Sequence, residues 1–89
     1  MYVYSQFVEK SQTYGTPFFQ LADGQATRSL QELVKDPQSL VSKYPEDFIL
    51  YNIAEFDEVT GLITPKRKAA DGFICRASAL VPIGSPEPA

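Results

Sequence analysis

The alternation of apolar and polar residues predicts two principal strands. Residues 2–8 alternate in a way that places one set of side chains, Tyr2, Tyr4, Gln6 and Val8, on a single face of an extended chain. Residues 48–56 are apolar or aromatic on both faces, which is typical of a central strand covered on both sides or by a dimer partner. A polar turn at 57–61 and a β-prone run at 62–64 complete a hairpin, because Gly61 can adopt a left-handed conformation without steric cost.

A helix is predicted for residues 24–35, where apolar side chains recur at the spacing of one helical face: Ala26, Leu30, Leu33 and Val34. Asp23 stands where an N-cap residue is expected. Asp36-Pro37 ends the helix, because the residue before a proline avoids the helical conformation. Asp36 is also placed to cap a short helical turn through Val41. We expect the long helix to lie on one face of a sheet.

The remaining segments complete the predicted fold. Residues 10–15 form a polar connection that bends at Gly15, and residues 16–20 form a short extended piece. Residues 73–81 are a candidate last strand. Residues 82–89 contain three prolines and a glycine, which predicts a disordered tail. The sequence therefore predicts a single α+β domain at 1–81, with a small antiparallel sheet of three to four strands and one main helix packed on one face.

Length and composition indicate that the domain needs assistance to be stable. A chain of 89 residues buries a modest fraction of its surface, and its single cysteine, Cys75, cannot form an intrachain disulfide. The absence of histidine excludes a zinc site of the usual ligand types. A homodimer, or binding to a partner, is the simplest source of assistance.

No segment of the sequence is typical of a membrane protein or of an exported one. The apolar runs are shorter than the ~20 residues that span a bilayer, and the N-terminal residues lack the features of a signal peptide. We therefore expect a protein of the bacterial cytoplasm that makes no contact with a membrane.

Charge is distributed unevenly along the chain, whose net charge is −3. Residues 31–58 hold seven acidic and two basic residues, whereas residues 59–76 hold four basic residues and one acidic residue. An acidic chain is poorly suited to sequence-independent binding of duplex DNA, which needs many phosphate contacts. The basic loop 66–68 beside the hairpin is a small candidate contact point.

Catalytic chemistry is not indicated. A hard cation requires oxygens that converge on one point, and the acidic residues near the hairpin, Asp47, Glu55, Asp57 and Glu58, are spread along the strand and its turn. Without histidine there is no base of the common kind to activate a serine or cysteine nucleophile. We therefore expect no enzyme activity, no metal and no cofactor, and consider a metal-dependent nuclease the least favoured class.

Binding is the remaining class of function. Single-stranded nucleic acid is held by bases that stack on aromatic rings beside cationic groups. The candidate phosphate-binding residues are Lys66, Arg67, Lys68 and Arg76, and the candidate stacking residues are Tyr2, Tyr4 and Tyr14. The competing interpretation places these rings in the core of a small protein without tryptophan.

Several short motifs resemble one family in order and spacing. They are Thr16-Pro17-Phe18-Phe19, Gly24-Gln25-Ala26-Thr27-Arg28, Asp36-Pro37, Pro45-Glu46-Asp47-Phe48-Ile49-Leu50-Tyr51 and Glu55-Phe56-Asp57-Glu58-Val59-Thr60-Gly61. The chain resembles, over roughly residues 2–65, the small nonstructural protein of gokushovirus-type microviruses, which are bacteriophages with small circular single-stranded DNA genomes.

The resemblance implies a protein that is absent from the virion and acts in DNA replication or packaging. It carries over no catalytic residue. The expected function is therefore that of a non-enzymatic accessory protein in the host bacterial cytoplasm, which contacts viral single-stranded DNA or the replication and packaging proteins. The alternative is a protein–protein interaction module that binds a host or phage protein through the acidic 46–58 region, without direct DNA contact.

Overall fold

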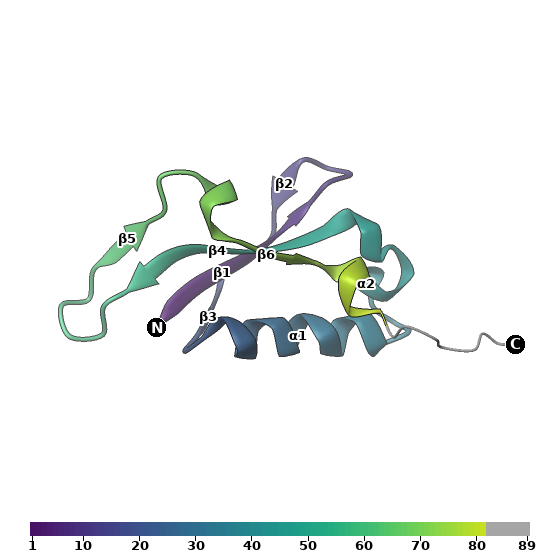
Figure 1. Ribbon diagram of the computed structural model, residues 1–89, viewed down its shortest axis with the longest axis horizontal. Coiled ribbons are helices and arrows are strands. Elements are labelled where there is room, and N and C mark those ends of the chain that lie inside the picture. Colours follow the sequence, from purple (N-terminus) through teal and green to yellow (C-terminus); the bar gives the residue numbers. More distant parts are fainter. Residues whose placement is uncertain (82–89) are drawn as a thin grey trace, which may run out of the picture.

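The computed structural model describes residues 1–81, so the tail predicted at 82–89 lies outside the described residues. In the described chain, one antiparallel sheet carries the main helix, α1 (Asp23–Lys35), on one face (Figure 1). The mixed α and β composition and the single main helix agree with the sequence prediction. The number of strands does not, because the described sheet has six strands rather than three to four.

Two long strands form the centre of the sheet and four short strands flank them. The strands are β1 (Tyr2–Val8), β2 (Thr13–Tyr14), β3 (Phe18–Gln20), β4 (Phe48–Phe56), β5 (Ile63–Pro65) and β6 (Phe73–Arg76). β1 pairs with β4, and its other edge pairs with β3 and β2. The other edge of β4 pairs with β5 and β6. Three of the short strands, β3, β5 and β6, overlap the extended segments predicted at 16–20, 62–64 and 73–81, whereas β2 lies in the segment predicted to be a polar connection.

A bulge in β4 changes which side chains face the helix. Tyr4 pairs with Asn52, but the preceding residue of β1, Val3, pairs with Ala54, so Ile53 has no partner in β1. Paired residues share a face, and one extra residue moves all later side chains to the opposite face. Ala54 therefore lies on the opposite face from Asn52. The simple alternation, which placed both on one face, is wrong beyond Asn52.

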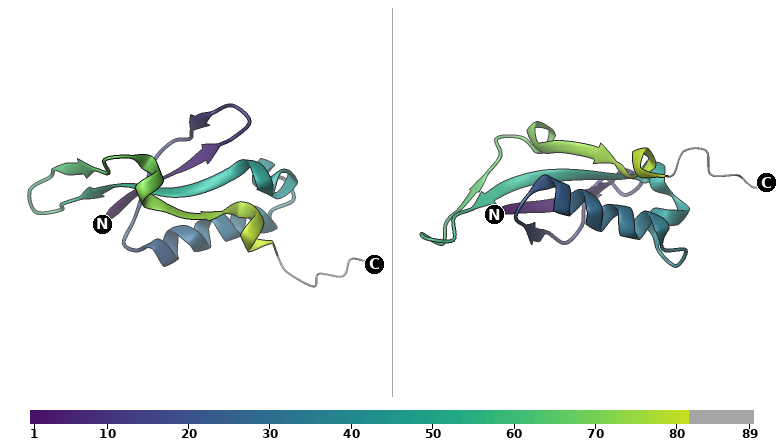
Figure 2. Two further views of the ribbon diagram at one scale, coloured as in Figure 1. Left: turned by 45° about the horizontal axis from the view of Figure 1, so that its top comes forward. Right: turned by 60° about the horizontal axis from the view of Figure 1, so that its bottom comes forward.

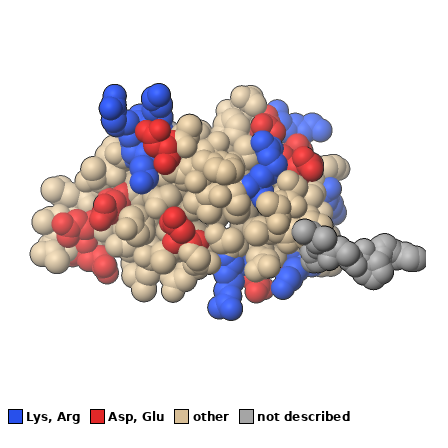
Figure 3. Space-filling view, in the orientation of Figure 1, with Lys and Arg blue, Asp and Glu red and all other residues tan. Residues whose placement is uncertain are grey.

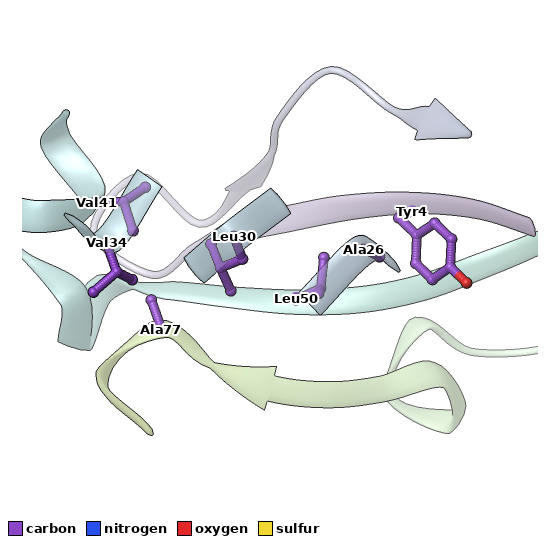
Figure 4. Packing of buried hydrophobic residues seen from close by; sticks show 7 residues of the cluster. All are labelled: Tyr4, Ala26, Leu30, Val34, Val41, Leu50 and Ala77. Carbon is purple, nitrogen blue, oxygen red and sulfur yellow. The ribbon is translucent and has the colours of Figure 1, made fainter. Parts of the chain in front are cut away.

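The hydrophobic core lies between α1 and the sheet (Figure 4). Its buried members are Tyr4, Ala26, Leu30, Val34, Val41, Leu50 and Ala77. The predicted helical face is confirmed for Ala26, Leu30 and Val34, while Leu33 packs at the margin and is only partly buried. No helix within residues 1–81 has the length and apolar character needed to cross a membrane.

Asp23 has a different role from the predicted one. It is the first residue of α1, and Ala22 occupies the N-cap position without a side-chain hydrogen bond. The Asp23 Oδ1 atom accepts hydrogen bonds from the Tyr4 hydroxyl (2.7 Å) and from Asn52 Nδ2 (3.2 Å). Burial, and then this bond to the Asp23 carboxylate, raise the pKa of Tyr4 well above its ordinary value. Asp23 thus ties the helix to both central strands.

The second helix, α2 (Leu40–Lys43), also begins differently from the prediction. Ser39 is its N-cap, and the Ser39 hydroxyl oxygen accepts from the Val41 N–H at 3.0 Å. Asp36 Oδ1 accepts instead from the Gln38 N–H at 2.9 Å. A 3₁₀ turn, η1 (Pro45–Asp47), then leads into β4.

The turn between β4 and β5 is confirmed. Gly61 has φ +79°, and the Asp57 Oδ1 atom accepts from the N–H groups of Val59 (2.8 Å) and Thr60 (3.3 Å). These backbone hydrogen bonds lower the pKa of Asp57. The bend after β1, in contrast, occurs at Gln12 (φ +59°) rather than at Gly15.

The last predicted strand is shorter than expected. A 3₁₀ turn, η2 (Ala69–Gly72), precedes β6, and another, η3 (Ala77–Leu80), follows it. Gly72 lies so close to β4 that a Cβ atom there would stand 1.7 Å from the Asn52 carbonyl oxygen. Only glycine permits this approach, which sets the path of the chain into β6.

Replacing Gly72 by alanine should therefore destabilise the protein. Relief of the overlap requires a shift of η2 or β4, and overpacking of this kind costs roughly 1–3 kcal/mol. The matched control is Gly24→Ala in the first turn of α1, where nothing lies within 4 Å of the added Cβ. We expect that control to be neutral or stabilising by about 0.5 kcal/mol. Urea denaturation measures the free energy of unfolding of both variants. Equal values would contradict the close approach of Gly72 to Asn52.

The thiol of Cys75 should react more slowly in the folded protein than in the unfolded chain. Cys75 is partly buried against the core, and this burial raises its thiol pKa. Because the thiolate is the reactive form, alkylation should begin at a higher pH in native protein than in urea. The measurement is the rate of labelling from pH 7 to 10 in both states. Coincident pH profiles would show that the thiol is not desolvated.

Candidate nucleic-acid interface

Within residues 1–81, no helix crosses the face of the sheet opposite α1. In Figure 1, α1 lies below the sheet, while the β1–β2 hairpin and the segment between β5 and β6 rise above it. The left view of Figure 2 brings this upper face forward. We call the surface formed by Phe7, Tyr14, Tyr51 and Phe73 the open face.

Four aromatic rings form a continuous row on the open face. Phe7 of β1 pairs with Tyr14 of β2, and Tyr51 of β4 pairs with Phe73 of β6. The ring centroids of Phe7 and Tyr14 are 4.9 Å apart, those of Tyr14 and Tyr51 are 5.9 Å apart, and those of Tyr51 and Phe73 are 6.0 Å apart. The row thus crosses the sheet diagonally, because Phe7 pairs with Ile49 rather than with Tyr51, and it joins the edge strands β2 and β6.

The most accessible rings of the row are those on the two edge strands, Tyr14 of β2 and Phe73 of β6. Tyr14 is 47% exposed and Phe73 is 57% exposed, whereas Phe7 and Tyr51 are half-buried. A contiguous apolar surface of this kind on a small protein indicates an interaction site, because single exposed apolar residues are common but rows of them are not.

Backbone contacts hold both exposed rings in place. The Ser5 hydroxyl donates to the Gly15 carbonyl at 2.8 Å, and the Gly15 N–H donates to the Gln6 carbonyl at 2.8 Å, which fixes the chain next to Tyr14. Phe73 follows Gly72, whose close approach to β4 fixes the other end. The rings are therefore presented by ordered backbone.

The basic loop Lys66–Lys68 lies next to the Phe73 end of the row. Lys66 begins the loop at the edge of β4, where its N–H donates to the Ile53 carbonyl at 2.9 Å. Lys66, Arg67 and Lys68 are all exposed. Figure 3 shows a group of basic side chains over this segment, at the upper left of the view. Cationic groups and aromatic rings thus share one side of the molecule.

Arg76 is engaged in a contact that the sequence did not reveal. Its Nη1 atom lies 2.8 Å from Glu9 Oε1 and also donates to the Glu46 carbonyl. Arg76 lowers the pKa of Glu9, and Glu9 in turn raises the pKa of Arg76. The pair joins the end of β1 to β6, so the charge of Arg76 is compensated within the protein.

Two of the three predicted stacking residues face the helix rather than the open face. Tyr4 is completely buried in the core, and Tyr2 packs at its margin with its ring 6.4 Å from that of Tyr4. The burial of Tyr4 corrects its assignment as a stacking residue, because its ring has no free face for a base, whereas the partly buried Tyr2 stays a predicted stacking residue outside the open face. Tyr14 is the predicted stacking residue that the open face includes.

Phe7, Tyr51 and Phe73 were missed by the sequence analysis. The alternation does place Phe7 on the face of β1 that Tyr4 does not share, and Tyr51 on the face of β4 that Leu50 does not share. The sequence therefore separates the two faces of each strand. It does not say which face the helix covers. The position of Phe73 depends on its pairing with Tyr51, which no local pattern encodes.

The carboxylates near the hairpin do not gather into a site. Asp57 binds the backbone of its own turn, and Glu58 lies 3.8 Å from the amino group of Met1. Among residues 1–81, no three histidine, cysteine, aspartate or glutamate side chains are placed to hold one metal ion, and no pocket is formed.

Comparison with known proteins identifies the family of the chain. No curated protein matches it. No solved structure matches it either. A family model described as Phage ORF5 protein matches residues 1–80, which is most of the chain. The protein therefore belongs to the Phage ORF5 protein family and is a bacteriophage protein.

Proposed function

We propose that this phage protein is a non-enzymatic accessory factor in genome replication and packaging, and that it contacts single-stranded viral DNA through the open face. The observation that carries the proposal is the row of rings from Tyr14 to Phe73, which ends beside the basic loop Lys66–Lys68. Its finer setting, a gokushovirus-type microvirus, rests on the sequence motifs described above.

The chemistry of the open face suits unpaired bases. A base stacked on an aromatic side chain contributes roughly 1–3 kcal/mol, and every base has a π face, so such binding tolerates any sequence. Lysine and arginine side chains supply the second requirement, since they neutralise phosphates and release counterions. In duplex DNA the bases already stack on each other, so no base face is available to stack on the rings of the open face.

The charge of the protein also favours single-stranded over duplex DNA. The net charge is −3, and the acidic residues at the β4–β5 hairpin would repel a long polyanion. A short single strand can lie on the open face and reach the basic loop without passing the hairpin. A virus with a single-stranded genome supplies such DNA in the host cell.

Removing the basic loop should weaken DNA binding and reduce its salt dependence. For single strands the slope of log K against log salt is about −0.7 for each phosphate neutralised. The variant K66A/R67A/K68A should therefore lower the magnitude of that slope by up to about 2. Titration of labelled single-stranded and duplex DNA at two salt concentrations measures the slope and the preference for single strands.

A matched control removes the same charge from the helix side. In the variant R28A/K35A/K43A, three exposed cations of α1 and α2 are replaced. It should retain the wild-type slope if the basic loop makes the phosphate contacts. The proposal fails if the wild-type protein shows no single-strand affinity at low salt, or if the two triple variants lose affinity equally.

A second candidate function is a protein–protein interaction module, and the β4–β5 hairpin favours it. Val59 at the tip is 94% exposed, and Leu62 and Ile63 beside it are also exposed. Asp57 and Glu58 flank these apolar side chains, so the tip suits an apolar site with a basic rim on another protein. The turn is held by the Asp57 hydrogen bonds, which limits the entropy lost on docking.

The two candidate functions predict that different variants lose binding. As bait in extracts of phage-infected cells treated with nuclease, wild-type protein should recover a partner if the hairpin docks on a protein. Val59→Asp should then lose that partner, because a charge at the tip cannot enter an apolar site, while K66A/R67A/K68A should keep it. The hairpin interpretation fails if Val59→Asp recovers the same partner as the wild type.

A further inference from the structure

We infer that the open face is a short site for about four nucleotides of single-stranded DNA, which crosses the β-strands from Tyr14 toward Lys66–Lys68 and is held by stacking at one end and by charge at the other. This inference rests on the proposed function and specifies the length and direction of the ligand at the same surface.

The length follows from the spacing of the rings. Tyr51 lies 5.9 Å from Tyr14 and 6.0 Å from Phe73, so the two exposed rings are at most about 12 Å apart. Consecutive nucleotides are about 3.4 Å apart along a stacked strand, and roughly twice that where bases are splayed onto separate rings. A splayed strand therefore covers the distance between the two rings in about two steps, which requires three nucleotides.

Exposure identifies where bases are received. Tyr14 and Phe73 are the two rings of the row with about half of their surface free, and each can receive one base. Tyr51 lies between them, is half-buried, and contacts both rings edge-on. It supports the two outer rings and leaves room for the middle nucleotide.

Charge gives the ligand a direction across the sheet. Beyond Phe73 the chain leads back through η2 to Lys66, Arg67 and Lys68, which are exposed. The charge of Arg76, in contrast, is compensated by the carboxylate of Glu9, which directly follows β1. Phosphates are therefore attracted mainly at the Phe73 end, where one further nucleotide brings the total to about four.

The Tyr14 end is then held mainly by stacking. Lys10, the basic residue next to that end in sequence, has its ammonium group 5.9 Å from the ring centroid of Tyr44, a residue outside the open face. Stacking depends little on salt, whereas phosphate contacts depend on it strongly. The two ends should therefore respond differently to salt.

Binding of oligothymidylates of two to twelve nucleotides at low salt tests the site length. Affinity should rise steeply up to about four nucleotides and then only in proportion to the number of positions the protein can occupy. Tyr14→Ala should lower the affinity for a five-nucleotide ligand about tenfold or more and leave the salt slope unchanged. K66A/R67A/K68A should lower both affinity and slope.

Controls separate loss of binding from loss of structure. Tyr14 and Phe73 are exposed, so their alanine variants should keep the wild-type thermal transition. Leu40→Ala removes an apolar side chain that is 62% exposed and lies in α2, outside the open face, and it should bind as the wild type does. Phe73→Ala should reduce affinity as Tyr14→Ala does, because each ring receives one base.

The outcomes distinguish this inference from the proposed function. No binding of any oligonucleotide would overturn both. Binding whose affinity keeps rising steeply beyond about eight nucleotides would overturn the short site but leave DNA contact intact. The same holds if Tyr14→Ala binds as tightly as the wild type, since one stacking end would then be absent. A plateau near four nucleotides together with the two ring effects supports the inference.

Discussion

Pairing between β1 and β4 is the constraint on which the rest of the structure depends. These strands lie about forty residues apart in sequence, and their antiparallel register determines which side chains face α1 and which face outward. The bulge at Ile53 shifts that register, so Tyr4, Leu50 and Asn52 are directed to the helix while Ala54 is directed away. Every other strand pairs with an edge of one of these two.

Asp23 connects this central pair to the helix. Its carboxylate accepts from Tyr4 of β1 and from Asn52 of β4, so the polar groups that the core would otherwise leave unpaired are used to position α1. Tyr4 lies in the core on one side of the sheet, and on the other side no helix within residues 1–81 covers the row of rings. The open face is thus a consequence of where the single long helix docks.

The open face combines two chemistries that come from distant parts of the sequence. Phe7 and Tyr14 lie near the start of the chain, Tyr51 in its middle, and Phe73 with the basic loop near its end. Antiparallel pairing brings the rings into one row, and the close approach of Gly72 to Asn52 brings the loop to the end of that row. This combination is the basis of the proposed contact with unpaired bases, and the acidic hairpin is the basis of the alternative proposal.

The sequence by itself determined the local elements: the β1 and β4 strands, the buried stripe of α1, and the turn that ends at Gly61, because each depends on spacing or on a backbone conformation that a few residues encode. It also identified the basic loop and Tyr14. The tertiary structure alone decided the rest. The bulge in β4 and the pairing of Tyr51 with Phe73 arise from contacts between distant segments. The same is true of the burial of Tyr4 and the compensation of Arg76 by Glu9, since an aromatic or charged residue looks the same in sequence whether it is covered, paired or free.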